Sequence, residues 1–566
     1  MNVAEYILAR LGEAGLTHMF AVPGDYAGKF LDALDDDPAI TRVPTINELG
    51  CGYAADGYGR FKGIGAACVQ YGVGGFVALN CAAGSWVERV PVAIISASPA
   101  TSDRLLEEQQ QILYHHSTGN LAADRNVYAQ ITVASEVITD PSLAPDQIDR
   151  AITAMLTFHR PIYLEVAANV WTQACGKPRG KLAAVKLESN AKFLASAVAA
   201  AWGMITAAQS PVLWFGVEIQ RYGLQKLAQK LVDVSGLPFT TTSLGKTVLD
   251  EAQPQFIGTY AGPASPAVTR DVMGSCDCPV ALGAIITDDY LNIMASSYGE
   301  MIAVNDEYAR VGATYFAQVT LEGFLKGLIE RFRKDKDFPR SWTPVDPCED
   351  DEEPAPPGQL TYNRFYHQLS AFLKDEKLLE SSVLVLGEST SLYVFGNLFG
   401  LPQNSFVAQA AWGSLGHETG CALGVALGSG KRPWVVAGDG GFMMICQELS
   451  SLARARINAA VFVMSNQGYA IEQAFVDITA FTPKGAFAAF DLLPTWDYIA
   501  LAKAFGVKGY RVETNDQLAA ALREIEKLTD VPALIEVVIP QKDLAPQLAR
   551  LAAPPPTLRK YKSVVE

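Results

Sequence analysis

The sequence contains no run of apolar residues long enough to cross a membrane as a helix. No window approaches ~18 consecutive apolar residues free of charge, although 49% of the 566 residues are hydrophobic. The first ten residues, MNVAEYILAR, carry charges at Glu5 and Arg10 and predict an amphipathic helix rather than a signal peptide. We therefore expect a cytoplasmic protein with no membrane partner.

Basic residues are too few for a typical nucleic-acid-binding protein. The 45 lysines and arginines are outnumbered by 60 aspartates and glutamates, which gives a formal net charge of −15. Nucleic acids and anionic membrane surfaces both require basic patches on the proteins that bind them. The charge balance therefore argues against both kinds of partner.

Cysteine shows no sign of a disulfide framework. The nine cysteines are odd in number and scattered without regular spacing, which indicates reduced thiols. Cys276 and Cys278 form the one close pair. We interpret them as ordinary loop or core residues rather than as a metal or redox site.

Histidine is also scarce, yet two of the six histidines are adjacent. His115 and His116 lie in the segment ILYHHST, residues 112–118. Neighbouring side chains on a helix or strand point in different directions, so the pair is poorly arranged for two ligands of one metal ion. We therefore predict that the two histidines have separate roles.

The apolar segments fall into three blocks, in each of which β-branched runs alternate with helical patterns. This alternation predicts an α/β fold of three doubly wound parallel sheets flanked by helices. The buried strands that we predict are residues 66–72, 92–98 and 162–167 in the first block, 212–217, 280–284 and 301–305 in the second, and 383–389, 434–440, 459–466 and 533–539 in the third.

Two interruptions separate these blocks. A weak one falls in residues 172–186, and residues 333–359 are dense in charge and proline, which predicts an exposed linker. We therefore expect domains at residues 1–185, 186–345 and 359–566, with a linker at residues 346–358.

Glycines and an aspartate, Gly438-Asp-Gly-Gly441, follow one predicted strand of the third block. Glycines at a helix start let the backbone approach a phosphate, but the segment is neither GxGxxG nor a Walker loop. An aspartate among such amides favours a Mg²⁺ that bridges to the phosphate. Asn466, 27 residues on at the end of the next strand, offers a second oxygen ligand. Taken alone, GDG is also a common turn.

Gly438-Asp-Gly440 combined with Ser465-Asn-Gln-Gly468 resembles the diphosphate and Mg²⁺ motif of thiamine-diphosphate enzymes, with serine in place of the usual first asparagine. The resemblance implies that Asp439 and Asn466 bind Mg²⁺ through their side chains and that Gln467 or Gly468, of which we favour Gly468, binds it through a backbone carbonyl. The remaining cofactor contacts that it implies in this domain are Ser389, Gly440, Gly441, Tyr469, Ala470 and Ile471. Ser389 and Ser391 stand where threonine and aspartate are common in related enzymes.

Two other segments resemble the rest of that cofactor site. TINELGCGYAADGYGR, residues 45–60, is similar to the family's N-terminal glutamate motif, so Glu48 would hydrogen-bond the aminopyrimidine and activate the cofactor. QAAWGSLGHETGCALGVALG, residues 409–428, implies that Leu415 bends the cofactor and that the Gly413 carbonyl contacts its amino group. Without the resemblance, the sequence would favour an ordinary helix-start residue at Glu48 and a core residue at Leu415.

The segment FAVPGDYAGKFLDAL, residues 20–34, the histidine pair and NQGYAIEQAF, residues 466–475, resemble pyruvate decarboxylase and its relatives that act on indolepyruvate, phenylpyruvate and branched 2-oxo acids. The resemblance assigns decarboxylation to Asp25, His115, His116 and Glu472, and it places Tyr290, Tyr393 and Phe475 in the substrate pocket. Histidine suits proton transfer near neutral pH. Considered alone, Asp25 also fits a turn and Glu472 a surface helix.

This resemblance covers nearly the whole chain and implies pyrimidine-binding, central and diphosphate-binding domains. The implied activity is non-oxidative decarboxylation of a 2-oxo acid to an aldehyde and CO₂ through a cofactor ylide and enamine. The cofactor would lie between two subunits, so a homodimer is the minimum and a homotetramer the expected assembly. A carboligase similar to acetolactate synthase is the alternative, and a non-catalytic thiamine-binding protein is a third hypothesis.

Overall fold

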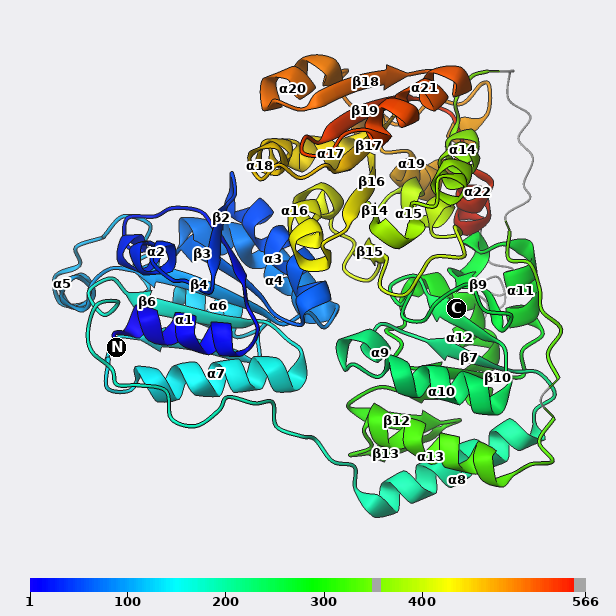
Figure 1. Ribbon diagram of the computed structural model, residues 1–566, viewed down its shortest axis with the longest axis horizontal. Helices are drawn as coiled ribbons and strands as arrows, with labels where there is room; N and C mark the ends of the chain where they lie inside the picture. The colour runs from blue at the N-terminus through cyan, green and yellow to red at the C-terminus, as the bar shows by residue number, and fades with distance from the viewer. Residues whose placement is uncertain (340, 349–357, 554–566) are drawn as a thin grey trace, which may run out of the picture.

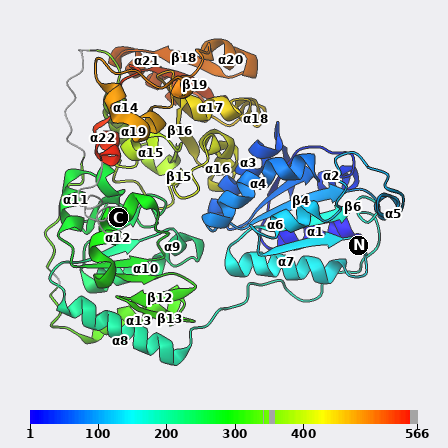
Figure 2. The ribbon, with the colours of Figure 1, turned by 180° about the vertical axis from the view of Figure 1, so that it is seen from behind.

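The computed structural model describes residues 1–339, 341–348 and 358–553, which form three α/β units, each built on one sheet. The N-terminal unit lies beside the C-terminal unit, and the central unit lies below the C-terminal one (Figure 1). The view from behind shows the same three lobes (Figure 2). The predicted fold class is confirmed.

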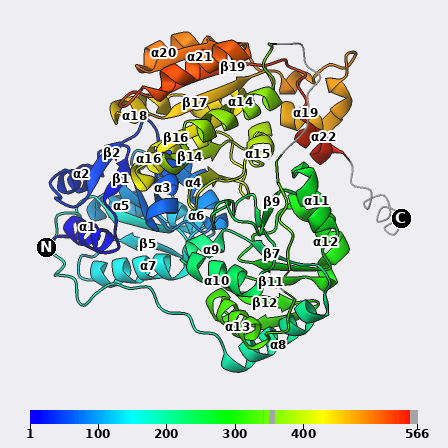
Figure 3. The ribbon, with the colours of Figure 1, turned by 45° about the vertical axis from the view of Figure 1, so that its right-hand side comes forward.

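The N-terminal unit has a parallel six-stranded sheet in the order β2-β1-β3-β4-β6-β5. Its strands are β1 (His18–Ala21), β2 (Thr41–Pro44), β3 (Gly65–Gln70), β4 (Val92–Ser98), β5 (Ala134–Ile138) and β6 (Ile162–Ala167). Its helices are α1 (Val3–Glu13), α2 (Gly28–Asp35), α3 (Glu48–Lys62), α4 (Val73–Val87), α5 (Thr101–Gln110), α6 (Ala123–Tyr128) and α7 (Ala144–Phe158). Helices α1 and α7 lie together on one side of the sheet, and α3 lies on the side toward the C-terminal unit (Figure 3).

The central unit has a seven-stranded sheet in the order β13-β12-β11-β10-β7-β8-β9. Its strands are β7 (Pro211–Phe215), β8 (Phe239–Thr242), β9 (Phe256–Tyr260), β10 (Cys278–Leu282), β11 (Ile302–Val304), β12 (Tyr308–Val311) and β13 (Thr314–Ala317). Its main helices are α8 (Ala191–Ala207), α9 (Glu218–Arg221), α10 (Gln225–Ser235), α11 (Ala267–Gly274), α12 (Leu291–Ser297) and α13 (Leu321–Lys334).

This sheet differs from the all-parallel expectation at one edge, where β12 and β13 run antiparallel to their neighbours. Only residues 305–307 separate β11 from β12, and a parallel neighbour would need a crossover of roughly a dozen residues. Gly312, with a φ of 56°, then turns the chain between β12 and β13. The edge is therefore a meander of short strands.

The C-terminal unit has a parallel six-stranded sheet in the order β15-β14-β16-β17-β19-β18. Its strands are β14 (Ser382–Leu386), β15 (Phe406–Ala408), β16 (Arg432–Gly438), β17 (Ala460–Ser465), β18 (Lys508–Val512) and β19 (Ala533–Val538). Its helices are α14 (Tyr362–Asp375), α15 (Thr390–Phe395), α16 (His417–Ser429), α17 (Asp439–Ile445), α18 (Glu448–Arg454), α19 (Ala470–Asp477), α20 (Tyr498–Phe505), α21 (Asn515–Glu526) and α22 (Pro546–Ala552).

All the predicted strands are present, each within three residues at either end. The strands that we did not predict are short or partly polar, such as β2 and β5. The predicted domain boundaries stay predictions, and most of the predicted linker, residues 349–357, lies outside the described residues. Among the helices that the structure describes, none has the length and apolar character that spanning a membrane would require.

Cys276 and Cys278 are both buried in the central unit. Burial raises the pKa of each thiol to about 12, so both are protonated at neutral pH. Both cysteines thus pack as core residues, and the absence of a metal or redox role stays a prediction.

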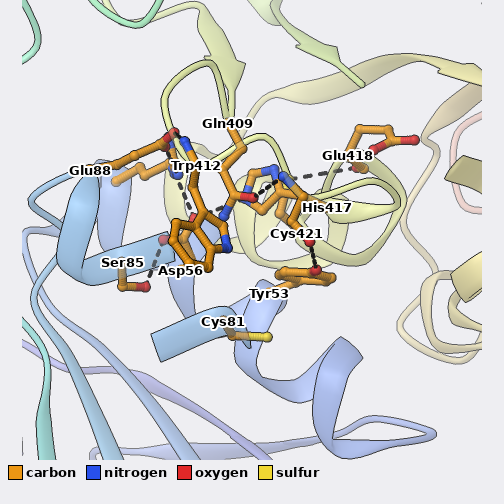
Figure 4. Close-up of polar contacts among 12 residues, drawn as sticks. Tyr53, Asp56, Cys81, Ser85, Glu88, Gln409, Trp412, His417, Glu418 and Cys421 are labelled. Atoms are coloured by element: carbon orange, nitrogen blue, oxygen red, sulfur yellow. Dashed lines mark hydrogen bonds and ion pairs between the residues drawn. The ribbon is translucent and has the colours of Figure 1, made fainter. Parts of the chain in front are cut away.

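Helix α3 of the N-terminal unit packs tightly against α16 of the C-terminal unit. A Cβ atom at Gly424 would lie 1.8 Å from the carbonyl oxygen of Ala54, so the two backbones touch. Charged residues lie buried beside this contact (Figure 4). The Arg60 guanidinium binds the carboxylates of Asp56 and Glu88, each at 2.6 Å.

The two carboxylates also bind groups of the C-terminal unit. Asp56 Oδ1 lies 3.0 Å from His417 Nε2, and Glu88 Oε1 accepts hydrogen bonds from the Ala411 and Trp412 backbone amides. Burial alone would raise the pKa of Asp56, but Arg60 and His417 hold it well below its usual range. The ionic cluster therefore joins the two units.

We expect Arg60→Leu to lower the free energy of unfolding by about 3–5 kcal/mol, because Asp56 and Glu88 would stay buried without their cation. The midpoint of thermal unfolding, followed by circular dichroism, measures this loss. Lys62→Leu, on an exposed position of the same helix, is the matched control. Equal midpoints for the two variants would contradict a structural role of the cluster.

Candidate active site

The predicted catalytic residues of the N-terminal unit lie together where β1 and β3 end. Asp25 follows β1, and its Oδ1 accepts a hydrogen bond of 2.7 Å from Nε2 of Gln70, the last residue of β3. The other oxygen, Oδ2, lies 2.9 Å from His115 Nε2. Burial by itself would raise the pKa of Asp25, but hydrogen bonds from His115 and the backbone outweigh it and leave this pKa lowered.

The histidine pair is held by aromatic residues of the same unit. The His115 ring stacks on Tyr26 at a centroid distance of 4.6 Å, and its Nδ1 lies 3.2 Å from the Tyr26 hydroxyl. The His115 backbone carbonyl accepts a hydrogen bond of 2.7 Å from the Tyr71 hydroxyl. His116 has a left-handed backbone with a φ of 68°.

The left-handed backbone of His116 overturns the expectation that the two adjacent histidine side chains point in different directions. The two rings meet edge to face at 4.8 Å, and ligand atoms of Asp25, His115 and His116 lie within 4.8 Å of one another. Adjacency therefore does not keep the two side chains apart, because the left-handed turn brings both rings to the same side. Asp25 forms a hydrogen bond with His115. That the two histidines have separate roles stays a prediction.

Glu48 is the first residue of α3, directly after the helix cap Asn47, whose side chain accepts from the Gly50 amide. It is half-buried and faces the start of α4. A Cβ atom at Gly74 would lie 3.1 Å from Glu48 Oε1 and 3.5 Å from Cβ of Gln70. The structure thus brings Glu48, Asp25 and the histidines to one side of the N-terminal unit.

The predicted metal residues lie at the ends of β16 and β17, which are neighbours in the C-terminal sheet. Asp439 Oδ2 accepts hydrogen bonds from the backbone amides of Asn466 and Gln467, at 3.1 and 2.7 Å. Asn466 Oδ1 lies 3.3 Å from the Gly468 amide. Burial raises the pKa of Asp439 to about 6 against these backbone hydrogen bonds.

A single cavity gathers most of the predicted cofactor residues. The residues that line it are Tyr362, Ser389, Thr390, Leu415, Gly438, Asp439, Gly440, Gly441, Asn466, Gly468, Tyr469, Ala470 and Ile471. Every predicted cofactor contact of the C-terminal unit except Gly413 belongs to this set. Gly413 precedes Leu415 on the same loop and has a φ of 70°.

Glu472 and Phe475 lie on the exposed face of α19, immediately after the cavity. Their spacing of three residues places both side chains on one side of the helix, together with Val476. Phe475 is 52% exposed and Val476 62% exposed. This face has the apolar character expected beside a substrate.

Tyr290 and Tyr393 lie apart from that face. Tyr290 is buried in the core of the central unit against Trp214, and its hydroxyl accepts from the Ser243 amide. Tyr393 is buried on α15 and donates to Asp289 across 3.2 Å, which joins the central and C-terminal units. In the single chain, both tyrosines pack as core residues and neither lines the cofactor cavity.

Sequence reasoning missed two acids beside the cofactor cavity. Glu388 lies two residues after the end of β14, and burial raises its pKa to about 8, with Asp289 and Glu88 adding to the effect. Glu418 lies beneath the glycine loop, where a Cβ at Gly441 would be 3.0 Å from Oε1, and burial raises its pKa to about 7. The strand-end rule that selected Ser389 would have found Glu388, whereas nothing local marks Glu418.

The candidate residues thus form two groups, one in the N-terminal unit and one in the C-terminal unit. Within the described part of the chain, no hydrogen bond or ion pair joins Asp25, Glu48, His115 or His116 to the residues of the cofactor cavity. Each group is open to solvent on one side.

Comparison with known proteins matches all three units to thiamine pyrophosphate enzymes. Residues 1–118 match the N-terminal TPP binding domain, residues 198–332 the central domain and residues 391–537 the C-terminal TPP binding domain of these enzymes. The fold and the three domain matches therefore define a thiamine-diphosphate-dependent enzyme.

Proteins that are similar over nearly the whole chain show which kind of thiamine-diphosphate-dependent enzyme this is. An alpha-keto-acid decarboxylase of Mycobacterium leprae is 30% identical over 98% of this chain and 95% of that protein. Pyruvate decarboxylase isozyme 3 of Saccharomyces cerevisiae is 28% identical over 98% of both chains. The chain belongs to the family of thiamine-diphosphate-dependent 2-oxo-acid decarboxylases.

Proposed function

We propose that this protein converts a 2-oxo acid to an aldehyde and CO₂ with thiamine diphosphate and Mg²⁺, as a cytoplasmic homodimer or homotetramer. The observation that carries the proposal is the hydrogen-bonded Asp25–His115 pair on the same side of the N-terminal unit as Glu48. Together, these three residues place a carboxylate, an imidazole ring and the acid that we propose activates the cofactor on one side of this unit. When bound, the cofactor supplies the thiazolium ring that accepts the electrons released with CO₂.

The C-terminal cavity fits a magnesium diphosphate. Asp439 Oδ, Asn466 Oδ1 and the Gly468 carbonyl are the hard oxygen ligands that Mg²⁺ prefers. The raised pKa of Asp439 reflects a buried carboxylate that receives only backbone amides, so a cation beside it would favour the ionised form. Leu415, whose Cδ2 would lie 3.8 Å from a Cβ at Gly441, closes one wall of the cavity.

The N-terminal residues fit the acid–base part of the reaction. Glu48 would hold a proton against the pyrimidine ring of the cofactor. The hydrogen bond with Asp25 would orient His115. A histidine of the pair could then donate a proton to the substrate carbon from which CO₂ has left. Glu472, on the exposed face of α19, would face the carboxylate of the substrate from the opposite side.

Exposed apolar residues support a dimer that joins the two groups. Val73 and Val77, on α4 near Glu48, are 54% and 42% exposed. Met444, on α17 near Asp439, is 48% exposed, and Phe475 adds a second apolar side chain to that unit. Large exposed apolar side chains near both half-sites fit surfaces that become buried when a second subunit completes the site.

The test is an assay of purified protein with thiamine diphosphate and Mg²⁺ against pyruvate, 2-oxoisovalerate, phenylpyruvate and indolepyruvate. We expect CO₂ and the matching aldehyde from at least one of them. Acyloin or acetohydroxy acid as the main product would instead identify a carboligase. No CO₂ from any of the four acids would overturn the proposal.

A further inference from the structure

The segment from Gln70, the last residue of β3, to Gly75, in the first turn of α4, contacts all the catalytic candidates of the N-terminal unit. Gln70 donates to Asp25, and the Tyr71 hydroxyl donates to the His115 carbonyl. Gly72 lies against the carbonyl of His116, and Gly74 lies against the carboxyl of Glu48. We call residues 70–75 the support turn. Its position therefore sets the positions of these side chains relative to one another.

Gly72 gives the support turn its shape. Its φ of 59° and ψ of −101° are unfavourable for residues that have a side chain. A Cβ atom there would lie 2.1 Å from the His116 carbonyl oxygen, so the turn and the histidine loop are in direct contact. A shift of Gly72 would therefore be transmitted to His116.

One side chain from another element holds Gly72. Asp124, on α6, is only 4% exposed, and its Oδ2 accepts a hydrogen bond of 2.7 Å from the Gly72 amide. The same oxygen would lie 2.6 Å from a Cβ at Gly75. The Tyr128 hydroxyl, also on α6, donates to the Gly75 carbonyl at 2.7 Å. Helix α6 thus grips the support turn at both Gly72 and Gly75.

Asp124 has no cation partner among the ion pairs of the described residues. Its other hydrogen-bond donor is the Tyr163 hydroxyl, at 3.4 Å, and its acidic neighbour Glu165 is itself paired with Arg104 at 2.8 Å. Tyr71 and Tyr128 also face this region. Burying a carboxylate without a cation costs free energy of folding. The hydrogen bonds that Asp124 accepts must offset this cost, and they hold the support turn in place.

We propose that Asp124 is a positioning residue that fixes the support turn and thereby places the His115–His116 loop and Glu48 for decarboxylation. This inference rests on the proposed function. The ionised carboxylate is the stronger acceptor for the Gly72 amide. Protonation would loosen the turn, which couples activity to pH.

The pKa of Asp124 sets the pH range in which the support turn should loosen. Burial raises the pKa of Asp124 to about 6, with Glu165 adding to the rise, and the Gly72 amide and Tyr163 oppose it. The carboxylate form, and with it the firm turn, is therefore present above about pH 6 and is lost as the pH falls through that value. This predicts an acid limb in the activity of the wild-type enzyme.

The test is Asp124→Asn in the full-length holoenzyme, because asparagine keeps the size of the side chain and offers only a neutral acceptor. We expect kcat/KM to fall about 10–100-fold, the loss typical of catalytic groups displaced by about an ångström. The acid limb near pH 6 should disappear. Labelled histidine ring carbons should show shifted NMR signals for His115 and His116, while the other four histidines keep theirs.

Two further variants keep the test decisive if Asp124→Asn folds poorly. Tyr163→Phe removes a hydrogen bond that favours the carboxylate and should move the acid limb to higher pH. Asp140→Asn removes the same charge at an exposed turn of the same unit and should leave activity and all histidine signals unchanged.

Unshifted His115 and His116 signals with wild-type kcat/KM in Asp124→Asn would overturn the positioning role. An acid limb in Tyr163→Phe that stays at the wild-type pH would also count against it. If the wild-type protein decarboxylates no 2-oxo acid, the proposed function fails, yet the histidine signals still report whether Asp124 positions the loop.

Discussion

Replacing Glu48 by Gln is expected to lower the rate of CO₂ release by about 10²–10⁴-fold, the range that a positioned acid or base contributes to catalysis. Glutamine has nearly the same shape but cannot give or take the proton that cofactor activation requires. Glu48 lies at a capped helix start and is only half-buried, so the substitution should leave folding intact. Steady-state turnover with saturating thiamine diphosphate, Mg²⁺ and substrate measures the effect.

Glu108→Gln, an exposed position on α5 of the same unit, is the matched control and should retain full turnover. Thermal unfolding midpoints of both variants should equal that of the wild type. Wild-type turnover in Glu48→Gln would refute the role assigned to Glu48. The hypothesis of a non-catalytic thiamine-binding protein would instead require that the wild-type protein itself show no turnover.

The second large effect is expected at the metal site. Asp439→Asn replaces the one carboxylate among the proposed Mg²⁺ ligands by a neutral amide, so Mg²⁺ should bind more weakly by at least about 10–100-fold, the loss that changes even to indirect partners of a metal ligand produce. The Mg²⁺ concentration for half-maximal activity should rise accordingly. Isothermal titration with thiamine diphosphate at fixed Mg²⁺ provides a readout that does not depend on turnover.

Asp477→Asn provides the control, because Asp477 is exposed at the end of α19 and its side-chain carboxylate accepts hydrogen bonds from Thr479 in its own turn. Its Mg²⁺ requirement should match that of the wild type. An unchanged Mg²⁺ requirement in Asp439→Asn would show that Mg²⁺ binds elsewhere in the cavity.

Local patterns predicted much of the C-terminal half-site. Asp439 and Asn466 were selected because each follows an apolar strand, and the carboxyl ends of neighbouring parallel strands meet at one edge of a sheet. The structure places both residues in one cavity with Ser389 and Leu415. The roles of these residues stay predictions, since position alone does not test them.

Other features escaped the sequence because they depend on contacts between distant segments. Glu418 has a raised pKa only because α16 buries it beneath the glycine loop. The packing of Tyr290 against Trp214 in the central core could not be predicted either, and its place in the substrate pocket stays a prediction. The antiparallel β12–β13 edge followed from a connection too short for a crossover, which the pattern of apolar runs does not reveal.

The sequence by itself determined the three α/β units, the strand-end residues and the resemblance to thiamine-diphosphate enzymes, because apolar periodicity and short motifs are local properties of the chain. Only the tertiary structure decided how His115 and His116 face Asp25, and that Asp124 supports their loop through Gly72. The physical reason is that Gly72 and Asp124 lie 52 residues apart in the chain, and their hydrogen bond exists only once β3 and α6 are packed.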